Sequence, residues 1–140
     1  MEKSTSEETP YRILLVDDDP TNLQILHQVL GGRGYKLIIA KSGEDALKIA
    51  ERMKPHLVLL DIMMPGIDGY ETCKRLKENP ETSNAAIIFL SAMDNPEDQK
   101  KGLEMGAIDF IQKPFESDHV IATVQTYFTT HKQKAEAKNS

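Results

Sequence analysis

The sequence contains no tryptophan, only one cysteine and no excess of basic residues. A lone cysteine, Cys73, excludes an internal disulfide and favours a reducing compartment. Seventeen Lys and Arg residues against 22 Asp and Glu residues give a formal charge of −5, which argues against direct binding of nucleic acid. These absences favour a cytoplasmic protein that acts on other proteins.

Long hydrophobic runs are missing as well. The longest runs, residues 13–16, 57–60 and 85–90, are far shorter than the roughly 18 residues that a transmembrane helix needs. The first ten residues are polar and acidic, without the apolar segment of a secretory signal. We therefore expect no membrane contact, and a length of 140 residues predicts one domain.

Short apolar runs alternate with amphipathic helical patterns along the chain. The runs predict strands at residues 13–16, 37–40, 57–60, 86–90 and 107–111. Each run is followed by apolar residues at helical spacing. Five such units in about 120 residues predict an α/β fold, a doubly wound five-stranded parallel sheet with helices on both faces.

Turn and capping residues mark the ends of the predicted helices. Gly31 follows the first helical pattern, Ser42 and Asn95 precede the second and fourth, and Ser117 opens the last. Polar segments flank the ordered part. We expect a flexible N-terminal segment at residues 1–10, a domain at 11–128, and a helix extension, linker or tail at 129–140.

Polar residues directly follow four of the five predicted strands. Asp17 and Asp18 follow the first strand and Asp61 follows the third. Ser91 follows the fourth strand and Lys113 comes shortly after the fifth. Because ligands of such sheets bind outside the carboxyl ends of the strands, we expect these side chains to converge.

The chemistry of this group favours phosphoryl transfer. Three crowded carboxylates repel one another, by about 4 kcal/mol for a pair ~4 Å apart at an effective dielectric near 20, and they need a cation. Mg²⁺ prefers carboxylate, water and phosphate oxygens. A carboxylate nucleophile, a metal, the Lys113 ammonium and the Ser91 hydroxyl together suit a site that receives a phosphoryl group.

Each residue also has a simpler structural explanation. An acidic triplet before Pro20 is typical of a helix cap. Asp61 and Ser91 fit turns, and Lys113 fits a solvated charge. Independent turn residues need not fall at the same end of successive strands, however, so the joint pattern favours a functional site.

The motifs in residues 13–20, 59–69, 90–92 and 113–115 together resemble the receiver domain of two-component response regulators. The resemblance covers residues 11–128, and the order and spacing of the motifs make it specific. It implies the flavodoxin-like (βα)5 receiver fold with strand order 2-1-3-4-5. It also implies a role in phosphorelay signal transduction.

The resemblance implies a role for each polar residue. Asp61 matches the phosphoacceptor, and Asp18 and Asp61 match ligands of Mg²⁺ or Mn²⁺. Asp17 matches an acid that acts through water, and Met63 matches a residue whose backbone carbonyl binds the metal.

Three further residues match the part of the family pattern that responds to the phosphoryl group. Ser91 and Lys113 match the hydroxyl and the lysine that contact it. The Lys113-Pro114 bond matches a cis peptide of the family. Phe110 matches the aromatic switch residue, although it has no hydroxyl and is equally explained as a core phenylalanine.

The resemblance also implies the partners. The phosphoryl group would come from a histidine kinase or a histidine phosphotransfer protein. A downstream effector would bind the face made by the fourth helix, the fifth strand and the fifth helix. The domain would catalyse only its own phosphorylation and dephosphorylation, so we expect no enzyme in the ordinary sense, and a homodimer stays open.

Three other functions compete with this one. A phosphohydrolase of the haloacid-dehalogenase kind usually has a second Asp two residues after the nucleophile, where this chain has Met63. A flavodoxin-type nucleotide site would need an anion-binding glycine loop after the first strand, which is missing. A degenerate receiver that only docks is disfavoured because every position of the phosphoacceptor site carries a residue with the required chemistry.

The methionines near the site bear on how long a phosphoryl group would last. Since methionine cannot orient water by a hydrogen bond, we expect Met63 and Met93 to leave hydrolysis of the phosphoryl group unassisted.

Overall fold

The computed structural model describes residues 10–92 and 96–139. The strands are β1 (Arg12–Val16), β2 (Lys36–Ala40), β3 (Leu57–Asp61), β4 (Ala86–Ser91) and β5 (Asp109–Gln112). The helices are α2 (Pro20–Leu30), α3 (Gly43–Met53), α4 (Gly69–Glu78), α5 (Pro96–Glu104) and α6 (Ser117–Asn139). The predicted cap Asn95, Met93 and most of the predicted N-terminal segment lie outside the described residues.

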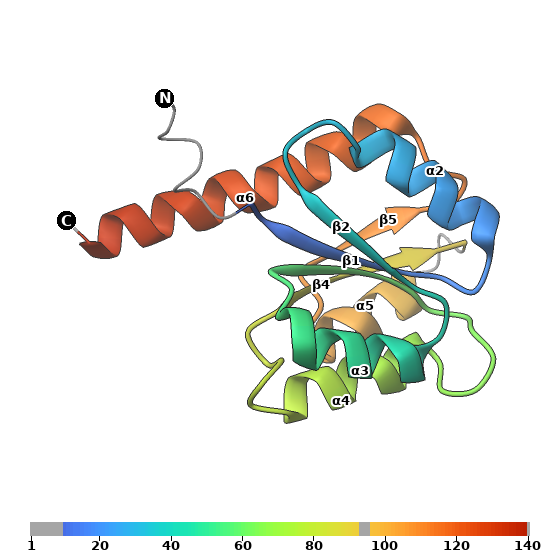
Figure 1. Ribbon diagram of the computed structural model, residues 1–140. Coiled ribbons are helices and arrows are strands. Elements are labelled where there is room, and N and C mark those ends of the chain that lie inside the picture. Colours follow the sequence, from blue (N-terminus) through green and yellow to red (C-terminus); the bar gives the residue numbers. More distant parts are fainter. Residues whose placement is uncertain (1–9, 93–95, 140) are drawn as a thin grey trace.

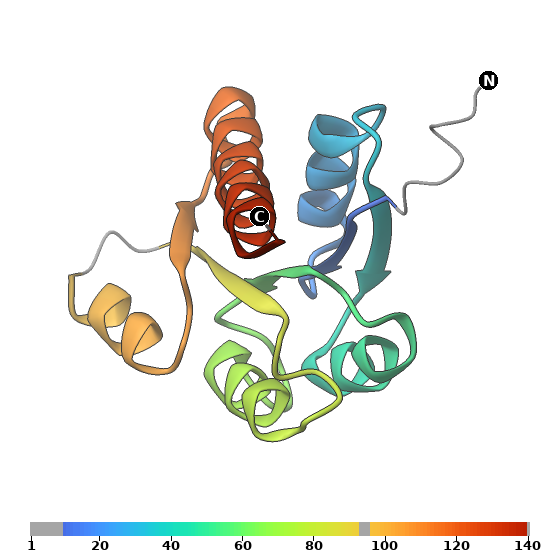
Figure 2. The same cartoon turned by 90° about the vertical axis from the view of Figure 1, so that its left-hand side faces the viewer.

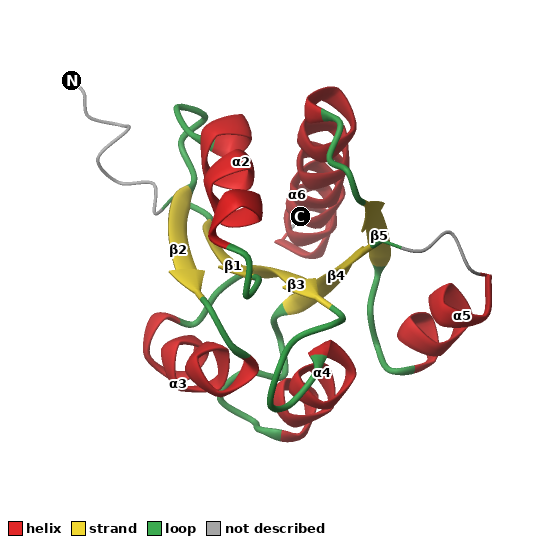
Figure 3. Cartoon of the chain, turned by 90° about the vertical axis from the view of Figure 1, so that its right-hand side faces the viewer, coloured by secondary structure: helices red, strands yellow, loops and turns green. Residues whose placement is uncertain are grey.

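The five strands form one parallel sheet in the order β2-β1-β3-β4-β5 (Figure 1). Helices α2 and α6 cover one face, and α3, α4 and α5 lie on the other, with α5 beside the β5 edge (Figures 2 and 3). The predicted fold class and strand order are therefore confirmed. No helix in the described part of the chain is long and apolar enough to cross a membrane.

The core explains why the apolar runs are continuous. In β1, Leu14 and Val16 join the cluster under α3 and α4, whereas Ile13 and Leu15 join the cluster under α2 and α6. All four side chains are fully buried. A strand packed on both faces cannot alternate polar and apolar residues, so the run is apolar throughout.

Local signals placed most element ends correctly. Ser42 caps α3, because its Oγ accepts a hydrogen bond from the Asp45 N–H at 3.0 Å. The prediction for the last strand was wrong by two residues at its start. The N–H of Ala107 bonds back to the carbonyl of Gly102 at 3.0 Å, so the chain is still closing α5 there and the sheet register begins at Asp109.

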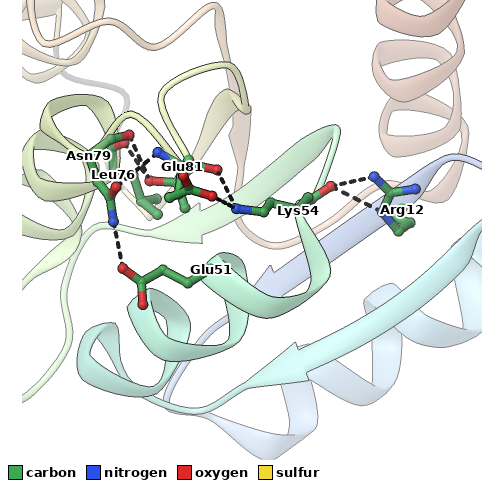
Figure 4. Close-up of polar contacts among 7 residues, drawn as sticks. Arg12, Glu51, Lys54, Leu76, Asn79 and Glu81 are labelled. Carbon is green, nitrogen blue, oxygen red and sulfur yellow. Dashed lines mark hydrogen bonds and ion pairs between the residues drawn. The ribbon is translucent and has the colours of Figure 1, made fainter.

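The amino ends of the strands are held by structural contacts. The Arg12 guanidinium donates to the carbonyls of Met53 and Lys54. Figure 4 shows the bond to the Lys54 carbonyl and the pairing of the Lys54 ammonium with Glu81. The rings of Tyr11 and Phe128 stack at 4.0 Å between centroids and anchor α6 to the start of β1. The polar residues that follow the strands lie at the other end of the sheet.

Candidate functional site

The strand ends deliver polar side chains to one edge of the sheet. The parallel register pairs Asp61 with Leu90 and Ser91 with Gln112, so the residues after β3, β4 and β5 lie at the same level. A cavity of about 540 Å³ at this edge is lined by all five candidates: Asp17, Asp18, Asp61, Ser91 and Lys113. The structure thus brings together the side chains that the sequence places far apart.

The three residues of the acidic triplet, Asp17 to Asp19, differ in role. Asp19 is the N-cap of α2, and its Oδ1 accepts from the Thr21 N–H at 2.9 Å. Asp19 also lines the cavity, but the carboxylate cluster there consists of Asp17, Asp18 and Asp61, with one carboxylate oxygen of each within 4.8 Å of the others. The helix-cap explanation therefore applies, within the triplet, to Asp19.

The carboxylate cluster has the donor set of a hard divalent cation. Asp17 is fully buried, Asp61 is 4% exposed, and Asp18 faces solvent. Three oxygen ligands with one open side fit Mg²⁺, which keeps several waters when it binds a protein. The residues present therefore fit the metal that the sequence indicates.

Lys113 supplies the positive charge of the site. Its Nζ lies 2.9 Å from Oδ1 of Asp61 and 3.2 Å from Oδ2 of Asp17. Partial burial lowers the pKa of Lys113, but the hydrogen bond to Asp61 and the charges of both carboxylates outweigh it, so the pKa is raised overall. The ammonium is thus firmly protonated beside Asp61.

Asp61 has the most perturbed environment of the cluster. Burial raises its pKa to about 6, with Asp17 and Asp18 acting in the same direction, while the Lys113 hydrogen bond and charge act against them. A carboxyl group shifted by burial and by like charges, and lining a cavity, is typical of a functional group.

The other candidates lie at or near the cavity. Met63 lines its mouth with a side chain that is 77% exposed, and the Lys113-Pro114 peptide bond is cis. Phe110 lies outside the set of described residues that line the cavity. Its ring packs 5.9 Å from the ring of Phe89, and Gly102 of α5 lies against it.

The sequence did not predict every residue at or beside the site. Asn22, in the first turn of α2, lines the cavity and donates its Nδ2 to Oδ2 of Asp17 at 3.2 Å. Beside the cavity, Gly69 at the start of α4 has to be glycine, because a Cβ there would lie 2.3 Å from the Asp61 carbonyl oxygen. The only signal in the sequence was the position of each at a helix start.

Comparisons with known proteins agree with this geometry. The family model of the response regulator receiver domain matches residues 13–125. The chain is 39% identical over 115 residues to response regulator PleD of Caulobacter vibrioides, and the matched part covers 82% of this chain and 25% of PleD. It is 34% identical over 113 residues to protein PilH of Pseudomonas aeruginosa, covering 81% of this chain and 93% of PilH.

A solved structure gives the same result. The crystal structure of a putative response regulator from Chloroflexus aurantiacus superposes with a TM-score of 0.79 at 38% identity, covering 84% of this chain and 97% of that one. Relatives differ greatly in length, since the chain spans about a quarter of PleD but most of PilH.

Proposed function

Because the chain belongs to the response regulator receiver domain family, we propose that it accepts a phosphoryl group on Asp61 and passes a signal to another protein. The observation that carries the proposal is the gathering of Lys113 and three carboxylates around a buried strand end. The donor would be a phosphohistidine on a histidine kinase or a phosphotransfer protein.

The transfer would proceed by in-line displacement at phosphorus. A carboxylate oxygen of Asp61 attacks, the O–P bond forms, and the P–N bond of the phosphohistidine breaks. The imidazole leaves with the electron pair. Lys113, already 2.9 Å from Asp61, would neutralise a phosphoryl oxygen, and the Ser91 hydroxyl would donate to another.

Asp18, Asp61 and the Met63 carbonyl would hold Mg²⁺, or Mn²⁺ in its place. When bound, the ion neutralises negative charge on the acceptor and on the phosphoryl oxygens. Asp17 would act through water, which is supported by its existing hydrogen bonds. Its Oδ1 accepts from the Asp19 N–H at 2.9 Å, and its Oδ2 faces the Lys113 ammonium.

The phosphoryl group would become a signal through the face of α5, β5 and α6. It adds about one negative charge and new acceptor oxygens beside Ser91, which would move to bond them and let Phe110 repack. Leu103 and Ile108 on this face are 53% and 46% exposed. Exposed apolar side chains support the binding of a downstream effector protein or domain there.

Incubation with Mg²⁺ and acetyl phosphate tests the proposal. The expected product is protein that carries one phosphoryl group, detected by intact mass and lost on treatment with hydroxylamine. Asp61→Asn abolishes it, whereas Asp45→Asn, an exposed aspartate of α3, leaves it unchanged.

The opposite outcome has a defined form. Sustained hydrolysis of phosphate esters without labelling of Asp61 would favour a phosphohydrolase. That function has less support, because the position two residues after Asp61 is the exposed Met63, which has no carboxyl group to act as acid or base.

A further inference from the structure

Asn22 is a polar side chain of the cavity to which the proposed function gives no role. It lies three residues into α2 and donates its Nδ2 to Oδ2 of Asp17 at 3.2 Å. Its side chain is half-buried and lines the same cavity as Asp61 and Lys113.

Three donors fix the orientation of the Asp17 carboxylate. Oδ1 accepts from the Asp19 N–H at 2.9 Å, and Oδ2 accepts from Asn22 and from Lys113, each at 3.2 Å. Because Asp17 is fully buried, bulk solvent competes little with these three donors. Two of the donors, the backbone N–H of Asp19 and the side-chain amide of Asn22, are uncharged groups from the segment that follows Asp17. Together they hold the carboxylate, and with it Oδ2, independently of the lysine.

The lysine is shared between two carboxylates. Nζ of Lys113 lies 2.9 Å from Oδ1 of Asp61 and 3.2 Å from Oδ2 of Asp17. Phosphoryl transfer turns one Asp61 oxygen into the bridging oxygen of an acyl phosphate and removes the carboxylate charge, so the attraction of Lys113 to the Asp61 oxygens weakens. Asp17 gives up no oxygen in the reaction and can hold the ammonium throughout it.

We propose that Asn22 is a positioning residue for phosphoryl transfer. Its amide fixes Oδ2 of Asp17, and this oxygen holds the Lys113 ammonium beside the reacting carboxylate. The inference rests on the proposed function of Asp61. It makes a geometric claim about Lys113 in the unphosphorylated protein and a kinetic claim about the transfer step.

Asn22→Leu tests both claims, since it removes the donor at similar volume. The matched control is Gln28→Leu, which removes an exposed amide from the same helix. In the reaction with acetyl phosphate an Asp61 oxygen bonds to phosphorus, the P–O bond to acetate breaks, and acetate leaves. At saturating acetyl phosphate and Mg²⁺ we expect Asn22→Leu to slow labelling by roughly 3- to 10-fold, the effect of one hydrogen bond of ordinary strength. The KM for acetyl phosphate stays unchanged, because Asn22 acts through Asp17.

The geometric claim is measured without phosphorylation. In ¹⁵N NMR spectra of metal-free protein, the Lys113 ammonium, assigned with Lys113→Arg, should give a resolved signal in the wild type and in Gln28→Leu. It should broaden in Asn22→Leu, or in Asn22→Ala if the leucine variant does not fold. An unchanged signal, or a maximal rate within 3-fold of the wild type, overturns the inference. A wild type that is not labelled at all overturns the proposed function instead, whatever the NMR result.

Discussion

In the metal-free protein, the surroundings of Asp61 disfavour the ionised form of its carboxyl group. Burial raises its pKa from 3.8 to about 6, and the charges of Asp17 and Asp18 add to the effect against the attraction of Lys113. Because the pKa is higher in the folded state, ionisation of Asp61 favours unfolding. The contribution of Asp61 to stability is therefore full below about pH 4 and is lost as the pH rises through about 6.

Asp61→Asn should consequently stabilise the metal-free protein at neutral pH. Without a group to ionise, the variant should exceed the wild type by roughly 1–3 kcal/mol in free energy of unfolding above pH 6. The difference should shrink to near zero at pH 4. Urea unfolding in EDTA at pH 4, 5, 6 and 7.5 measures it, with Asp45→Asn as control. A difference that does not vary with pH would contradict the assigned cause.

Met63 permits a second prediction at this scale. Its exposed side chain lies at the mouth of the cavity and cannot orient a water molecule by a hydrogen bond. Met63→Asn adds an amide there, and one new hydrogen bond to the attacking water should speed loss of the phosphoryl group by roughly 2- to 10-fold. The decay of labelled protein after removal of acetyl phosphate measures the rate. An unchanged decay rate would show that hydrolysis is not controlled from this position.

Residues that follow strands could be predicted from the sequence, whereas those that act across the cavity could not. Asp61 and Lys113 stand directly after or near apolar runs, and parallel strands bring such positions to one edge. Asn22 lies within a helical pattern that would look the same without Asp17. The need for glycine at position 69 comes from the Asp61 carbonyl, which only the folded chain brings near.

At the scale of elements, α5 is attached through a few small contacts. Gly102 is its buried residue, and a Cβ there would lie 2.6 Å from Cζ of Phe110 and 2.9 Å from Cδ2 of Phe89. The Lys101 ammonium lies 4.3 Å from the centroid of the Tyr70 ring. The backbone of α5 therefore packs directly against the ring of Phe110, and any movement of that ring would change the packing of the helix.

Gly102→Ala should destabilise the protein although alanine favours helices. The added methyl group meets two aromatic rings, and such overpacking costs about 1–3 kcal/mol, more than the gain of about 1 kcal/mol in helix propensity. Chemical unfolding measures the loss against Lys100→Ala, an exposed substitution in the same helix. If the Gly102→Ala variant were more stable than the wild type, α5 would be able to move away from Phe110 without a cost in the free energy of unfolding.

The elements themselves were largely predictable, because a strand buried on both faces has to be apolar throughout. The late start of β5 was not, since the residues before it look like a strand but close α5 through the Ala107 bond to Gly102. The stacking of Tyr11 on Phe128 joins opposite ends of the chain and leaves no local signal. Long-range packing therefore accounts for what the sequence did not predict.

At the scale of the whole molecule, the two ends of the sheet differ in character. At the amino ends, the Arg12 guanidinium donates to backbone carbonyls, and the Lys54 ammonium pairs with Glu81 (Figure 4). At the carboxyl ends, Lys113 pairs with Asp17 and Asp61, and Asp18 adds a third carboxylate to the same cluster. The first arrangement stabilises the fold, whereas the second leaves excess negative charge in a cavity, which a bound cation would neutralise.

Mg²⁺ should therefore stabilise the whole domain through this one site. A ligand that binds only the folded state at ten times its Kd adds about 1.4 kcal/mol, which raises the Tm of a domain this size by roughly 3–6 °C. Asp18→Asn removes an exposed carboxylate of the cluster and should abolish most of the rise while changing the metal-free Tm little. Thermal unfolding across a Mg²⁺ titration at constant ionic strength, with Asp45→Asn as control, measures both. An equal rise in Asp18→Asn would place the binding of magnesium elsewhere on the molecule.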